Sequence, residues 1–124
     1  MLGIRTAEEL AGSPLAGPVW ETLVGSELRR ALLNAGRQAE LFFWRDRQRE
    51  VDFVLHRAGR FKLAEAKWTE LPDAKDTANL RAVAAELRKN SAGLRAVICR
   101  CANAFPLGEG VQAVPLGGVG DLVG

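Results

Sequence analysis

The chain has 124 residues, a length that fits one domain with a single hydrophobic core and is too short for two independently folded domains. Hydrophobic residues make up 48% of the sequence and charged residues 26%, which excludes a largely disordered chain, while a net charge of +2 neither demands nor excludes a nucleic-acid partner. No apolar run reaches the roughly 18–20 residues that cross a bilayer, and the N-terminus has no secretory signal pattern. We therefore expect a cytoplasmic protein without a membrane partner.

Two helices are predicted before the first strand. Thr6 and Glu9 have the spacing of a capping box, so the segment 1–16 predicts a short lead-in helix. A longer helix is predicted to begin at Gly17-Pro18, because proline is tolerated at the first helical position, and to end at Gly36. Its apolar residues recur with helical spacing and form one broad face, which consists of Val19, Trp20, Leu23, Val24, Leu28, Ala31 and Leu32.

From residue 41 the pattern changes to the short apolar runs that are typical of strands. Three strands are predicted in succession, over 41–45, 50–57 and 61–67, and the last two are joined by a turn at Ala58-Gly59. A helix introduced by Pro72-Asp73 follows, then a fourth strand over 94–100 and a strand-like piece at 111–114. The order αβββαβ predicts an α/β sandwich, with a mixed sheet of four to five strands flanked by helices.

The predicted hairpin brings two acidic residues together. A two-residue loop at Ala58-Gly59 sets a register in which Asp52 lies directly against Glu65. Opposed carboxylates repel each other, so the pair requires a cation between them, either a metal ion or a positive side chain. Lys67 shares a strand face with Glu65. Two hard oxygen donors beside a lysine suit phosphodiester hydrolysis assisted by Mg²⁺ or Mn²⁺.

Other charged residues leave alternatives open. Glu21 and Glu27 both lie near the apolar face of the long helix, and the pattern alone does not choose between them as a third acidic group. Arg45, Arg47 and Arg49 predict either a phosphate-binding groove beside the acidic pair or a solvated turn whose charge is neutralised by its acidic neighbours.

The runs GPVWETLVGSELRR, FFWRDRQREVDFVL and FKLAEAKW resemble the C-terminal domain of a large family of bacterial and archaeal AAA-type ATPases, and the resemblance covers nearly the whole chain. That domain is similar to the PD-(D/E)XK, restriction-endonuclease-like superfamily. In nucleases of this superfamily an acidic residue on the first core helix, an Asp on the second strand and an E-x-K on the third form the metal site. Matched position by position, these residues are Glu21, Asp52, Glu65 and Lys67, and the carbonyl of Ala66 is a further expected metal ligand.

The resemblance implies a restriction-endonuclease-like sandwich in a single domain over 1–124. We expect a lead-in helix over 1–16, a core over 17–104, and a C-terminal strand and tail over 105–124. The chain lacks the Gly-x-x-x-x-Gly-Lys-Ser/Thr loop that binds nucleotide phosphates, so we expect it to be a fragment of a longer AAA-type ATPase. Isolated domains of the superfamily are often dimers, so a homodimer is expected by analogy alone.

Three functions fit these observations. The first is a nuclease that uses Mg²⁺ or Mn²⁺ to hydrolyse DNA or RNA. The second is a non-catalytic module of an AAA-type ATPase that binds DNA or a protein partner. The third is an ordinary α/β interaction domain in which the acidic cluster is incidental. For Asp52, Glu65 and Lys67 themselves, the alternative to a metal site is a cross-strand salt bridge on a solvated edge. The four intact residues of the motif favour the first function, whereas the missing ATPase machinery and the modest net charge favour the second.

Overall fold

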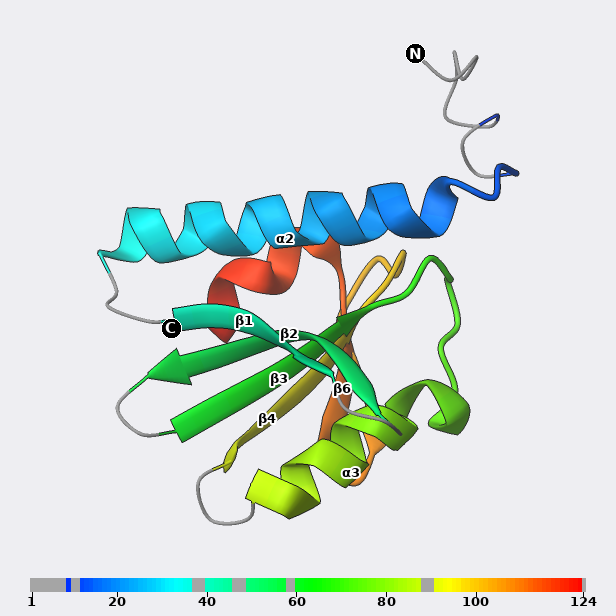
Figure 1. Ribbon diagram of the computed structural model, residues 1–124. Helices are drawn as coiled ribbons and strands as arrows, with labels where there is room; N and C mark the ends of the chain where they lie inside the picture. Colours follow the sequence, from blue (N-terminus) through cyan, green and yellow to red (C-terminus); the bar gives the residue numbers. More distant parts are fainter. Residues whose placement is uncertain are drawn as a thin grey trace.

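The structure is a computed structural model that describes Glu9 and the residues 12–36, 40–45, 49–57, 60–87 and 91–123. The predicted lead-in helix over 1–16 lies mostly outside the described residues. The rest of the fold is an α/β sandwich in which helices cover both faces of a six-stranded mixed sheet (Figure 1), which confirms the predicted fold class. None of the described helices combines the length and the hydrophobicity that a membrane crossing requires.

Helix α2 (Ala16–Ala35) packs on one face of the sheet, as its apolar spacing predicts. The helix ends as expected at Gly36, which adopts a left-handed φ of 63° and donates its N–H to the carbonyls of Leu32 and Leu33. Glycine adopts this conformation without the strain that a Cβ atom would cause. The side chains that α2 buries against the sheet include Trp20, Val24, Leu28 and Leu32.

The sheet has the strand order β1-β2-β3-β4-β6-β5. Strands β1, β2 and β3 are antiparallel, β3, β4 and β6 are parallel, and β5 runs antiparallel to β6. The edges are therefore formed by β1 and β5. The strands span Glu40–Arg45 (β1), Glu50–Arg57 (β2), Arg60–Ala66 (β3), Ser91–Ile98 (β4), Phe105–Gly108 (β5) and Val111–Val114 (β6).

Six strands replace the four to five that the sequence predicts. The additional strand β5 has only four residues, and two of them are proline and glycine, which are uncommon inside strands, so the sequence does not predict it as a strand. Beyond β6 the tail folds into a 3-10 helix, η3 (Leu116–Leu122), in place of an irregular end. The three glycines of η3 favour a loop, but Val119 and Leu122 are buried beneath α2, and this packing overrides the local preference.

The sheet separates two apolar clusters. Figure 1 shows α2 and η3 on one face and α3 (Ala78–Leu87) on the other, where α3 continues from the 3-10 helix η1 (Ala74–Thr77). We call these the α2 face and the α3 face. The strand residues buried on the α2 face include Phe53, Leu55, Ala64, Ala96 and Ile98. Those buried on the α3 face include Val51, Val54, Leu63, Val97 and Val111.

A β-bulge interrupts β2 next to the edge strand β1. Between two consecutive paired positions of these strands, β1 has one residue, Phe43, whereas β2 has two, Asp52 and Phe53. Beyond the bulge, β2 and β3 pair from Arg57 with Arg60 to Phe53 with Ala64, which is the register predicted from the hairpin turn. Bulges change the direction of side chains and recur next to active sites, and this bulge contains a predicted site residue.

Candidate functional site

Asp52 contacts the end of β3 through a backbone group. Its Oδ2 accepts a hydrogen bond of 2.9 Å from the N–H of Ala66. The paired register of β2 and β3 ends with Phe53 and Ala64, one residue before the Asp52–Glu65 pair expected from the hairpin. The bulge against β1 adds one residue to β2 at this point, and bulges change the direction of side chains. Burial raises the pKa of Asp52, while the bond from Ala66 and the charge of Lys67 act against this increase.

Glu65 is a buried carboxylate, with only 4% of its surface exposed. Leu63 belongs to the α3 face, so Glu65, two residues later on the same strand, points to that face as well. Burial, followed by the charge of Asp52, raises the pKa of Glu65 to about 7, while the charge of Lys67 and a hydrogen bond with Asn79 oppose the shift. The protonated form of Glu65 is therefore more favoured than that of an exposed glutamate when no further cation is bound.

Lys67 is the cation that all three predicted acids share. It follows β3 directly, and its backbone N–H donates to the carbonyl of Ile98 at 2.9 Å. Its charge lowers the pKa of Glu65, of Asp52 and of Glu21, in each case against the larger opposing effect of burial. One lysine among three carboxylates leaves the group with a net negative charge when all the acids are ionised.

Glu21 lines a cleft between α2 and the strands β1 and β2. Partial burial, followed by the charge of Asp52, raises the pKa of Glu21. Glu27 pairs instead with Arg30 at 3.2 Å, so the structure brings Glu21 rather than Glu27 toward Asp52. The cleft has a volume of about 530 Å³ and is lined by Glu21, Arg29, Leu41, Phe42, Phe43, Arg45, Glu50, Val51, Asp52 and Phe53.

We call Glu21, Asp52, Glu65 and Lys67 together the acidic site. The atoms of this site that could bind a metal ion are all oxygen atoms. Within the described ranges, no three Asp, Glu, His or Cys side chains gather closely enough to hold a metal ion by themselves. Asp52 and Glu65 approach the end of β3 from different directions, and Glu21 lies on the α2 wall of the cleft. Carboxylate and carbonyl oxygens are the ligands that Mg²⁺ and Mn²⁺ prefer, so the donor chemistry fits either ion.

The three predicted arginines have different positions. Arg45 lines the cleft and forms an exposed ion pair with Glu50 at 3.2 Å. Arg49 bonds to Glu86 of α3 at 2.6 Å and is not among the residues that line the cleft. Arg47 lies outside the described residues. The structure therefore places Arg45 in the cleft and pairs Arg49 with α3.

Sequence reasoning missed Arg29, Phe43 and Asn79. Arg29 follows Glu21 by eight residues on α2, which is close to two helical turns, so both line the same cleft. That spacing is a signal that the sequence contains. Asn79 has no comparable signal, because its contact with Glu65 depends on how α3 packs against the sheet.

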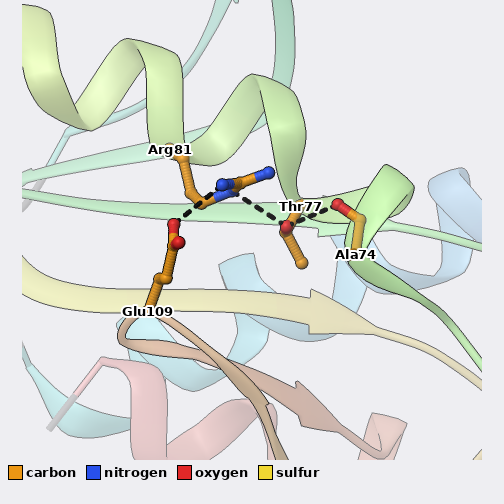
Figure 2. Close-up of polar contacts among 4 residues, drawn as sticks. All are labelled: Ala74, Thr77, Arg81 and Glu109. Atoms are coloured by element: carbon orange, nitrogen blue, oxygen red, sulfur yellow. Dashed lines mark hydrogen bonds and ion pairs between the residues drawn. The ribbon is translucent and has the colours of Figure 1, made fainter.

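A hydrogen-bonded network anchors the start of α3 beside the site (Figure 2). The buried Thr77 hydroxyl donates to the carbonyl of Ala74 at 2.7 Å and accepts from the Nε of Arg81 at 3.2 Å. Arg81 also donates to Glu109 at 2.7 Å, in the turn between β5 and β6. The network ties the first turn of α3, which contains Asn79, to the far part of the sheet.

Comparison with known proteins identifies a family for most of the chain. No curated protein and no solved structure matches the chain significantly. A family model described as "Domain of unknown function (DUF4143)" matches residues 16–119. The match begins with the first residue of α2 and ends within η3, so it contains all six strands and the whole acidic site. The chain belongs to the DUF4143 family.

Proposed function

We propose that this domain is a divalent-metal-dependent nuclease that hydrolyses nucleic-acid phosphodiesters, as its resemblance to the C-terminal domain of AAA-type ATPases and to the PD-(D/E)XK superfamily implies. The main support is the buried Glu65, whose pKa is raised to about 7 by burial and by the charge of Asp52. In a purely structural ion pair, one positive charge would compensate one negative charge. Here the single ammonium group of Lys67 interacts with three carboxylates. Such a group gains stability from a second cation.

The residues that would hold Mg²⁺ or Mn²⁺ are Asp52, Glu65 and the carbonyl of Ala66. The fit rests on their oxygen donors and on the buried, partly uncompensated charge of Glu65. Glu21 lines the cleft together with Asp52, but among the described residues no three acidic side chains gather closely enough to hold an ion by themselves. Asp52 is already held beside the Ala66 peptide by a 2.9 Å hydrogen bond. When bound, such an ion polarises a phosphate and lowers the pKa of a coordinated water.

Lys67 and Arg45 would act on the substrate itself. The ammonium group of Lys67, close enough to lower the pKa of all three acids, would orient the attacking water and stabilise the negative charge that develops on the phosphate oxygens. The guanidinium group of Arg45 lies at the cleft wall, where it would contact a neighbouring phosphate.

The test is a cleavage assay on labelled single-stranded DNA, duplex DNA, branched DNA and RNA, with Mg²⁺ or Mn²⁺ and with EDTA as the blank. We expect metal-dependent cleavage of at least one substrate, and a decrease of about 100-fold or more in Lys67→Met. Lys75→Met, which changes an exposed lysine of η1, is the matched control and should cleave like the parent.

Two results would contradict the nuclease proposal. One is the absence of cleavage of all four substrates by the parent chain, and the other is equal cleavage by the parent and by Lys67→Met. Metal binding without any cleavage would instead support the non-catalytic module of an AAA-type ATPase that binds DNA or a protein.

A further inference from the structure

We propose that the cleft between α2 and β1 binds an unpaired nucleic-acid strand, with Phe43 stacking on a base and Arg29 contacting a backbone phosphate. The inference rests on the proposed function, because it names the kind of strand on which the acidic site would act. Neither residue belongs to the acidic site, and both line the cleft that contains Glu21 and Asp52.

Phe43 presents an aromatic ring to solvent beside the acidic site. It is 65% exposed, and it stands opposite the bulge that contains Asp52. Its neighbour Phe42 packs edge-on against Phe61, with ring centroids 6.4 Å apart. Phe42 therefore contributes to packing, whereas the ring of Phe43 is available to a ligand in the cleft.

Two arginine side chains line the same cleft as this ring. Arg29 lines the cleft from α2, and the Arg45 guanidinium carbon lies 5.8 Å from the centroid of the Phe43 ring. Arg45 is also paired with Glu50, which offsets part of its charge. Proteins that bind single strands combine an aromatic ring, on which a base stacks, with cations that neutralise the phosphates. Phe43 and Arg29 supply this combination from opposite walls of one cleft.

A duplex is a poor partner for this arrangement. Within a double helix each base is covered on both faces by its neighbours, and only its edges are accessible in the grooves. Phe43 stacks only on a base with an open face, as in a single strand, a loop or a frayed end. The volume of about 530 Å³ lies in the range of clefts that enclose a small ligand, which corresponds to a short stretch of one extended strand.

The test measures by fluorescence anisotropy how tightly the full chain binds a labelled single strand and the corresponding duplex. Ca²⁺ replaces Mg²⁺ and Mn²⁺ in the buffer, and a gel shows whether the strand stays uncleaved. We expect the parent to bind the single strand about tenfold more tightly than the duplex, and Phe43→Ala to lose about tenfold in single-strand affinity and with it the preference. Phe43→Trp should keep both. Leu33→Ala, which truncates an even more exposed apolar residue outside the cleft, is the control and should bind like the parent.

The proposed contact between Arg29 and a backbone phosphate is tested separately, by the salt dependence of the binding affinity. Arg29→Gln should decrease the slope of log affinity against log salt concentration by about 0.7, the value expected for one lost phosphate contact to a single strand. Arg30→Gln, which changes the adjacent arginine that pairs with Glu27, should leave the slope unchanged.

Equal affinity for strand and duplex, or parent-like binding by Phe43→Ala, would overturn the inference. These outcomes are distinct from those of the nuclease test. A strand preference that depends on Phe43 without any cleavage supports the cleft assignment and contradicts the nuclease. Cleavage without such a preference supports the nuclease and contradicts the cleft assignment.

Discussion

The Oδ2 atom of Asp52 accepts a 2.9 Å hydrogen bond from the backbone N–H of Ala66, which joins the bulge of β2 to the end of β3. Ala66 stands between Glu65 and Lys67, so the bond places Asp52 beside the strand segment that carries the other two site residues. The position of this acid is thus determined by the backbone of β3, in addition to the charges around it.

The two functions of Asp52, as a hydrogen-bond acceptor and as a charge, can be separated by substitution. Asp52→Ala leaves the N–H of Ala66 without its acceptor, and we expect it to lower the free energy of unfolding by about 1–3 kcal/mol. Asp52→Asn retains an acceptor oxygen and removes the repulsion with Glu65, so it should change stability by less than about 1 kcal/mol. Urea unfolding in EDTA measures both, and an equal loss in the two variants would contradict the importance of the bond.

Glu65 should make the stability of the metal-free protein depend on pH. Its pKa increases from 4.5 to about 7 on folding, so between these pH values the folded state binds more protons than the unfolded state. The free energy of unfolding therefore decreases as the pH rises through this window, by up to about 3 kcal/mol from this group alone. Glu65→Gln removes this contribution, so its stability should exceed that of the parent by a margin that grows from about pH 5 to about pH 8.

The measurement is a series of urea unfolding curves for both proteins in EDTA across that range. Glu27→Gln, which removes a carboxylate from a surface ion pair, serves as the matched control and should follow the parent. A constant difference between the parent and Glu65→Gln at every pH would show that the Glu65 carboxyl is not perturbed in this way.

Much of the fold is predictable because strand and helix patterns are local. The register of β2 and β3 follows from the length of their turn, and the end of α2 follows from Gly36. Strand β5 and the helix η3 are not predictable in the same way. Their residues have weak local preferences, and their conformations depend on pairing with β6 and on burial under α2.

The candidate site is likewise predictable only in part. Hairpin geometry predicts that Asp52 and Glu65 lie at one end of β3. The bulge at Asp52 depends on pairing with β1, and this pairing cannot be predicted from the local sequence pattern. The contact of Asn79 with Glu65 likewise depends on how α3 packs. The choice of Glu21 as an expected site residue rests on the family resemblance, since periodicity alone does not distinguish it from Glu27.

The network around Thr77 should stabilise the protein without taking part in chemistry. Thr77→Val removes a buried hydroxyl that donates to Ala74 and accepts from Arg81, and we expect a loss of about 1–2 kcal/mol in the free energy of unfolding. Glu109→Gln alters only the exposed end of the network and should cost less than about 0.5 kcal/mol. Thermal or urea unfolding distinguishes the two, and a larger loss in Glu109→Gln would contradict this ranking.

The most direct test of the acidic site is a calorimetric titration of the full chain with Mn²⁺ or Mg²⁺ near pH 8, where Glu65 is largely ionised. We expect the parent and Glu27→Gln to bind the ion with equal affinity, and Glu65→Gln to bind it at least about tenfold more weakly. Absence of binding by the parent, or unchanged affinity in Glu65→Gln, would contradict the assignment of a metal site to these residues.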